Sequence, residues 1–177
     1  MIFFKDDFNN CLNDIDFYNN RLIYVIKDGK DTVVNDLYNT FSSYVEGIQK
    51  ELEQKSVVKI QGIETYSGPV FEYCRNLYTK WNRPVDCHAY WGYEGTGSFK
   101  MHSDPYDVEI MVQHGTKRIY IADENTYQDI KELESQYIPA NIPHRAENIT
   151  DCLSLSFSCY SFVREEGKSI SDVGIKL

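Results

Sequence analysis

The chain lacks the features that would mark it as membrane-bound or exported. No apolar run in its 177 residues approaches the roughly 20 residues that a membrane-spanning helix needs. The opening residues, Met1 to Asp7, do not form a charged segment followed by a long apolar core, which argues against a signal peptide. We therefore expect a cytoplasmic protein without membrane association.

Paired cysteines and basic runs are also missing. The five cysteines are scattered and form no C-x-x-C pair, which is typical neither of a zinc ribbon nor of a disulfide framework. Reduced, mostly buried thiols are the expected state. The net charge is −9 and no Lys/Arg run compensates for it, which argues against a nucleic-acid partner. With no internal repeat or linker, we expect a single domain over residues 1–177.

The composition is that of a globular domain with a real core, because 42% of the residues are hydrophobic and 25% are charged. In residues 1–84, apolar spacing predicts strands at 22–26 and 56–60 and a turn at 28–31. Spacing of three and four residues predicts a helix over 34–54, with Leu37 on its apolar face. A second helix is predicted over 67–81, with an apolar face that includes Phe71 and Tyr78.

From Val85 onward the pattern changes to short strands separated by turns. We expect strands at 85–93, 97–104, 107–113, 117–122, 135–139, 144–148 and 152–162, with a short helical turn over 125–133. A mainly β fold follows, namely a double-stranded β-helix (a cupin or jelly-roll barrel) with the N-terminal helices packed on it. The barrel core with the metal site is expected at 85–162, followed by a polar tail at 163–177.

Three residues form the candidate metal site. His102 and Asp104 are two apart, so a strand would place both side chains on one face, and His144 follows about forty residues later. Two histidines and one carboxylate are the ligands of non-haem Fe(II) oxygenases. Each residue also has a structural interpretation: Asp104 precedes Pro105 and suits a turn, and His144 follows Pro143 and suits the start of a strand.

Lys117 is the candidate cation of the same site. Val108, Ile110 and Val112 alternate with polar residues, and a two-residue turn at His114-Gly115 would pair Val112 with Lys117 on the apolar face. A buried ammonium is costly without a partner, so this lysine would be neutral or would bind an anion such as the carboxylate of 2-oxoglutarate. Alternatively, its side chain extends to solvent from the strand end.

These residues resemble the JmjC and cupin-like Fe(II)/2-oxoglutarate oxygenases, and most of all their ribosomal-protein and asparaginyl hydroxylase branch. The matching segments are His102-Ser-Asp104-Pro-Tyr-Asp107-Val108, Gln113-His-Gly115-Thr-Lys117-Arg118, and Tyr137-Ile-Pro139 with Pro143-His144. The resemblance implies His102, Asp104 and His144 as iron ligands, with O2 as co-reactant. It also implies Lys117 as the partner of the distal 2-oxoglutarate carboxylate. Further contacts are expected from Tyr90, Ser98 and Ser156.

The chain also departs from that branch. Its members carry further C-terminal segments for dimerisation and a winged-helix-like part, whereas this chain ends soon after its last predicted strand. A small-molecule or amino-acid substrate is therefore as much expected as a peptide. Where relatives place an arginine beyond the second histidine, this chain has Ser154, which leaves only the lysine. Arg145 is a candidate substrate contact. His88 and His114 are expected to be surface or core histidines, although both are possible ligands in a cupin-type metalloenzyme that does not use 2-oxoglutarate.

Two other functions stay open. A cupin-type metalloenzyme would use the metal for dioxygenation, isomerisation or hydrolysis without 2-oxoglutarate. A non-catalytic binding barrel would contain the three residues incidentally. The substrate and the oligomeric state do not follow from the sequence.

Overall fold

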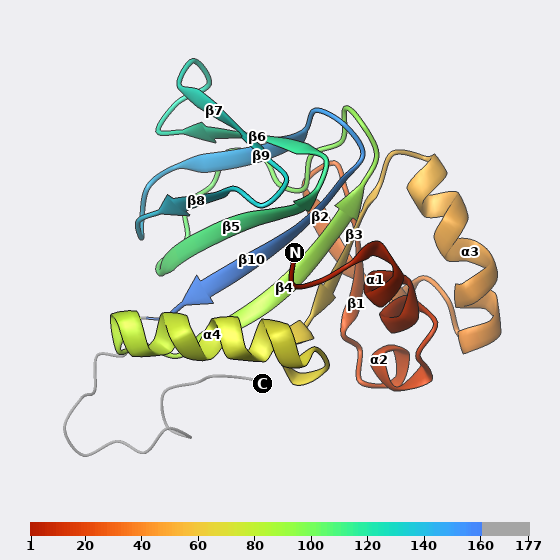
Figure 1. The fold of residues 1–177 in the computed structure, drawn as a ribbon. Coiled ribbons are helices and arrows are strands. Elements are labelled where there is room, and N and C mark those ends of the chain that lie inside the picture. The colour runs from red at the N-terminus through yellow and green to blue at the C-terminus, as the bar shows by residue number, and fades with distance from the viewer. Residues whose placement is uncertain (161–177) are drawn as a thin grey trace.

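The structure, a computed structural model, describes residues 1–160 (Figure 1). The predicted tail at 163–177 and the end of the last predicted strand lie outside these residues. The helical elements are α1 (Lys5–Leu12), α2 (Ile15–Asn19), η1 (Val34–Asp36), α3 (Phe41–Glu53), η2 (Ile63–Thr65) and α4 (Gly68–Trp81). The strands are β1 (Ile23–Lys27), β2 (Lys30–Val33), β3 (Val57–Gln61), β4 (Val85–Gly92), β5 (Asp107–His114), β6 (Thr116–Ile121), β7 (Tyr127–Lys131), β8 (Ser135–Ile138), β9 (His144–Asn148) and β10 (Cys152–Cys159).

The strands form two antiparallel sheets. The larger sheet has the order β2-β1-β3-β4-β10-β5-β8, and the smaller has the order β7-β6-β9. In Figure 1 the larger sheet lies between the helices and the smaller sheet. This is the mainly β, cupin-like architecture that the sequence predicted, with N-terminal helices packed on it.

Strand alternation gives the larger sheet two different faces. On β10, Leu153, Leu155 and Phe157 are fully buried in the core that the helices cover. The serines between them, Ser154 and Ser156, point to the other face and line a cavity between the sheets. A second apolar cluster, which includes Val112 and Ile119, closes the space between the sheets beside that cavity.

The N-terminal half is more helical than the sequence indicated. Residues 5–12 and 15–19, for which the sequence predicted no helix, form α1 and α2, whose buried Phe8, Leu12 and Phe17 join the large core. The helix expected over 34–54 begins only at Phe41, where the Thr40 side chain accepts a hydrogen bond from Ser43 N and caps it. Leu37, expected on its apolar face, precedes that cap and is exposed.

Other local predictions were also wrong. The helical turn expected over 125–133 is instead strand β7, which pairs with β6. Residues 97–104 form isolated bridges rather than a continuous strand. Phe71 and Tyr78, expected on the apolar face of α4, are exposed, and Val70, Cys74 and Leu77 are the residues that α4 buries.

The expected hairpin at His114-Gly115 is also absent, because β5 and β6 belong to different sheets. Gly115 has a φ of +80°, and a Cβ there would lie 2.0 Å from the carbonyl oxygen of Asp151. The chain therefore passes from one sheet to the other at a position that only glycine fits. Within residues 1–160, no helix combines the length and the apolar character that crossing a membrane requires.

Candidate metal centre

The three candidate metal ligands come from two segments that a short backbone bridge holds together. His102 and Asp104 lie between β4 and β5, and His144 is the first residue of β9. His102 N donates to the carbonyl oxygen of His144 at 3.0 Å, and His144 N donates to that of His102 at 2.7 Å. Asn141 N donates to the carbonyl oxygen of Asp104 at 2.7 Å. Backbone bonds thus fix both segments around the three side chains.

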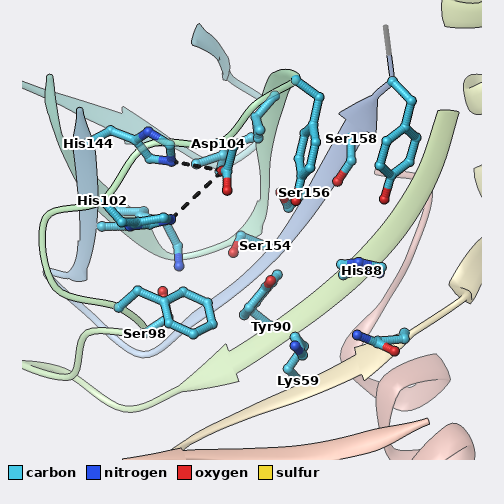
Figure 2. A pocket seen from close by; sticks show the side chains of 18 residues that line it. Lys59, His88, Tyr90, Ser98, His102, Asp104, His144, Ser154, Ser156 and Ser158 are labelled. Carbon is cyan, nitrogen blue, oxygen red and sulfur yellow. Dashed lines mark ion pairs between the residues drawn. The ribbon is translucent and has the colours of Figure 1, made fainter. Parts of the chain in front are cut away.

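The three side chains converge on one point (Figure 2). One ligand atom from each residue lies within 4.8 Å of the other two. Asp104 Oδ2 lies 3.5 Å from His144 Nε2 and 3.8 Å from His102 Nε2. The two imidazole rings are tilted against each other, with their centroids 4.5 Å apart. Each residue therefore directs one donor atom toward a common centre.

The far side of each imidazole is held by a backbone carbonyl. His102 Nδ1 lies 2.8 Å from the carbonyl oxygen of Lys100, and His144 Nδ1 lies 3.0 Å from that of Ile142. A carbonyl only accepts, so each Nδ1 is the protonated nitrogen. Both Nε2 lone pairs are then free to bind a metal ion, an orientation that such outer hydrogen bonds commonly fix.

The charges around the three candidate ligands suit a bound metal cation. Burial, together with the nearby His102, lowers the pKa of His144, which outweighs the opposing effects of the Ile142 carbonyl and Asp104. His144 is therefore neutral at neutral pH. His144 Nε2, His102 Nε2 and an oxygen of Asp104 face one another, an arrangement that a bound metal ion would stabilise.

Lys117 lies on β6 with only 4% of its surface exposed, as its predicted inward position requires. Burial is the main cause that lowers the pKa of its ammonium group. Within residues 1–160 it forms no ion pair, although it lines the cavity that contains the three candidate ligands. The other group that affects the pKa of Lys117 is the thiol of Cys152. This thiol is uncharged at neutral pH because burial raises its pKa.

The cavity has a volume of about 430 Å³ and receives side chains from both sheets (Figure 2). The other predicted cosubstrate contacts, Tyr90, Ser98 and Ser156, also line it, so the candidate metal ligands and cosubstrate contacts share one space. The sequence did not point to several other lining residues, namely Lys59, Gln61, Phe99, Tyr106, Ser158 and Tyr160. His88, expected to be a surface or core histidine, also lines the cavity. The alternation of serine with apolar residues along β10 was a signal that could have found Ser158.

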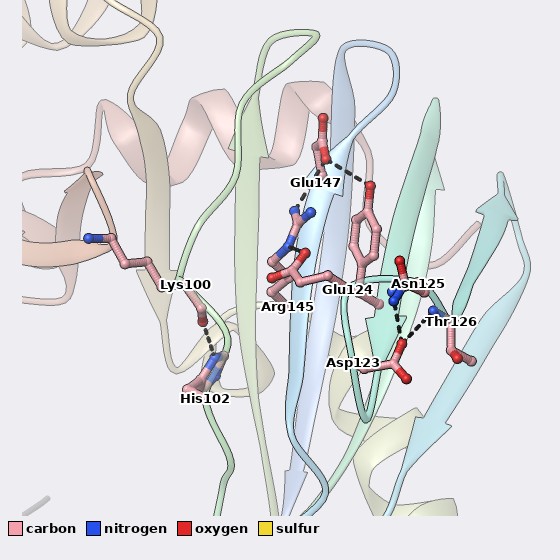
Figure 3. A network of polar contacts seen from close by, with 9 residues as sticks. Lys100, His102, Asp123, Glu124, Asn125, Thr126, Arg145 and Glu147 are labelled. Carbon is pink, nitrogen blue, oxygen red and sulfur yellow. Dashed lines mark hydrogen bonds and ion pairs between the residues drawn. The ribbon is translucent and has the colours of Figure 1, made fainter.

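Arg145 lies outside the cavity. Its Nε lies 2.6 Å from Glu124 Oε2 and its Nη1 lies 3.2 Å from Glu147 Oε2, while its guanidinium stacks over the ring of Tyr120 (Figure 3). These contacts hold the outer face of the strand that begins with His144. His114, expected to be a surface or core histidine, lies at the surface, where its side chain is 55% exposed and stacks on Trp91.

Comparison with known proteins supports the fold. No protein-family model and no curated protein sequence matches the chain. Among solved structures, YcfD, a ribosomal oxygenase from Escherichia coli, aligns with a TM-score of 0.69 at 14% identity, over 98% of this chain and 46% of that one. YcfD in complex with cobalt and 2-oxoglutarate aligns with a TM-score of 0.68 at 17% identity, over 92% of this chain and 45% of that one.

The chain thus spans less than half the length of the oxygenase structures that it matches. At these identities the likeness shows the fold alone, which is the double-stranded β-helix with N-terminal helices that the sequence predicted.

Proposed function

We propose that this chain is an Fe(II)- and 2-oxoglutarate-dependent oxygenase that hydroxylates a small-molecule, amino-acid or peptide substrate. One observation carries the proposal. Three metal-binding atoms converge in the same cavity as a buried lysine that has no ion-pair partner among residues 1–160. A metal site alone would suit many cupin proteins, whereas the added buried cation calls for an anion beside the metal.

Each residue of the site has its own proposed role. His102, Asp104 and His144 hold the metal on one face and leave its other positions open. Lys117 binds the distal carboxylate of 2-oxoglutarate, and Tyr90, Ser98 and Ser156 offer hydroxyl groups to the cosubstrate or the substrate. Val108 and Ile110 give the cavity an apolar wall. Bound iron would supply the O2 chemistry, and the protein would supply the geometry.

The cellular setting and the partners belong to the same proposal. All five cysteines are free and buried, which suits the reducing cytoplasm. The net charge of −9 disfavours nucleic acid as a partner, so the expected partners are the substrate and the cosubstrate.

The experiment is to incubate the purified protein with Fe(II), 2-oxoglutarate and O2 and to measure succinate. We expect succinate from the wild type, none from Asp104→Ala, and much less from Lys117→Ala. Lys131→Ala is the matched control, because Lys131 is exposed on β7 of the same small sheet. An Asp104-dependent activity on another compound that Lys117→Ala leaves intact would indicate a cupin-type metalloenzyme instead. A protein that binds no added iron would indicate a binding barrel.

A further inference from the structure

The end of the cavity away from the metal contains a second buried lysine. Lys59 lies on β3 with 5% of its surface exposed, and its side chain lines the cavity beside Tyr90 (Figure 2). In the sheet register, Lys59 is opposite Tyr90, and Tyr90 is opposite Ser154. Two strand spacings, about 10 Å, therefore separate the backbone of Lys59 from that of Ser154. Lys59 and Ser154 thus bound the cavity from strands two apart.

Asp31 on β2 and Tyr24 on β1 contact the ammonium group of Lys59. Lys59 Nζ lies 2.7 Å from Asp31 Oδ2 and 4.3 Å from the centre of the Tyr24 ring. The Asp31 side chain is 41% exposed, whereas that of Lys59 is 7% exposed. Solvent therefore weakens this pair from the Asp31 side, and an ammonium group has three N–H donors of which Asp31 takes one. The others can bind an occupant of the cavity.

His88 gives independent evidence of a polar occupant. Its ring lines the same end of the cavity, and its Nδ1 is buried without a hydrogen-bond partner in the part of the chain that the structure describes. Burial is the main cause that lowers the pKa of His88, so the ring is neutral and offers one N–H donor. Asp86 Oδ2 lies 3.9 Å from His88 Nε2 and accepts a hydrogen bond from the Tyr160 hydroxyl, and Asp86 does not line the cavity. An unpaired buried nitrogen is costly unless a ligand satisfies it.

The charge around the cavity favours an anion. Its lining residues include two lysines, Lys59 and Lys117, against one carboxylate, Asp104, although the whole chain has a net charge of −9. On the proposed function, on which this inference rests, the divalent metal adds two positive charges and 2-oxoglutarate adds two negative ones. One positive charge then remains among the groups that line the cavity. Asp31, which pairs with Lys59 from outside the lining, is 41% exposed and offsets this charge only in part, so Lys59 is the lysine that the cosubstrate does not use.

We propose that Lys59 anchors the carboxylate of the substrate, and that the substrate is a small organic acid with an apolar body. Its carboxylate would meet Lys59 and the His88 side chain. Its carbon body would lie against aromatic rings that line the same cavity, namely Tyr90, Phe99, Tyr106 and Tyr160. The hydroxylated carbon would face the metal.

The test uses three acids, benzoate, phenylacetate and hexanoate, each compared with its own carboxamide. Binding is measured by calorimetry on the protein loaded with Co(II) and 2-oxoglutarate. We expect at least one acid to bind about tenfold or more tightly than its amide, because a hydrogen bond to a charged group is worth that much. Lys59→Met should abolish this preference, and Lys59→Arg should keep it. Lys30→Met, at an exposed lysine on β2 of the same sheet, is the matched control.

Three results would overturn the inference: no binding of any of the six compounds, no preference for the acids, or a preference that survives in Lys59→Met. Melting temperatures show that each variant is folded. The affinity for 2-oxoglutarate, measured first, separates this inference from the proposed function. If 2-oxoglutarate does not bind, the proposed function fails, and the same titration of the cobalt-only protein still reports on Lys59. If it binds and Lys59→Met changes nothing, only the acid-binding role of Lys59 fails.

Discussion

Replacing Lys117 by methionine should strengthen the fold and weaken cosubstrate binding at once. Methionine has a similar length and places no charge in a site where Lys117 is 4% exposed. In the free protein the ammonium is buried without an ion-pair partner among residues 1–160, and burial lowers its pKa. Removing an uncompensated buried charge should raise the free energy of unfolding by about 1 kcal/mol or more.

The same substitution removes the partner of the 2-oxoglutarate carboxylate. Loss of one member of a buried, hydrogen-bonded charge pair costs about 2–5 kcal/mol, which corresponds to at least about 30-fold in the dissociation constant of 2-oxoglutarate. The gain in stability should shrink at alkaline pH. A lysine with a lowered pKa binds fewer protons in the folded state than in the unfolded state, so wild-type stability rises as pH approaches the ordinary lysine pKa of about 10.4.

Urea unfolding of the metal-free protein and calorimetric titration with 2-oxoglutarate measure the two effects. Lys131→Met, at an exposed position of the small sheet, should change neither. The reasoning is refuted if Lys117→Met binds 2-oxoglutarate within about threefold of the wild type, a difference well under the 1.4 kcal/mol of a tenfold change. A clear loss of stability would also refute it, because the lysine would then have a partner in the fold.

Three further predictions concern other parts of the site. Gly29→Ala should cost more than about 1 kcal/mol of stability, because φ there is +80° and a Cβ would lie 3.1 Å from Lys100 Cγ. It should also weaken metal binding, because the carbonyl of Lys100 holds the His102 ring. Urea unfolding and metal titration measure the two effects. His88→Gln should flatten the loss of stability as pH falls below about 6.5, because burial lowers the pKa of His88 and the unfolded chain takes up the proton; unfolding at several pH values checks this. Chelating the metal should lower the melting temperature, since metal at about 100 times its dissociation constant adds about 2.7 kcal/mol of stability, and no change in a thermal scan would contradict a metal site.

The metal ligands could be predicted because their local patterns carry chemical information. His102 and Asp104 lie two apart, and His144 follows a proline. The sequence does not show what brings them together, namely the backbone bridge between His102 and His144. That bridge depends on strand pairing across the whole barrel. For the same reason the predicted strand over 97–104 was wrong, since only two of its residues, Gly97 and His102, form bridges.

Tertiary context also decided the other errors. Residues 125–133 contain polar residues at a spacing that suits a helical turn, but β7 gains hydrogen bonds to β6 and buries Ile130 completely. Lys117 was placed inward correctly through a hairpin that does not exist, because the alternation of side chains along β6 is the same in either sheet.

Lys59 escaped prediction because a single lysine in a β-branched strand usually points to solvent. Its buried position depends on the sheet around it, in which β1 and β4 pair with the two edges of β3. No local pattern in the sequence contains that information.

The most direct test of the central claim is a crystal structure of the protein with Co(II) and 2-oxoglutarate. The account predicts one cobalt ion bound by His102 Nε2, His144 Nε2 and a carboxylate oxygen of Asp104, with the distal carboxylate of 2-oxoglutarate on Lys117. Cobalt bound elsewhere, or 2-oxoglutarate bound without contact to Lys117, would contradict it.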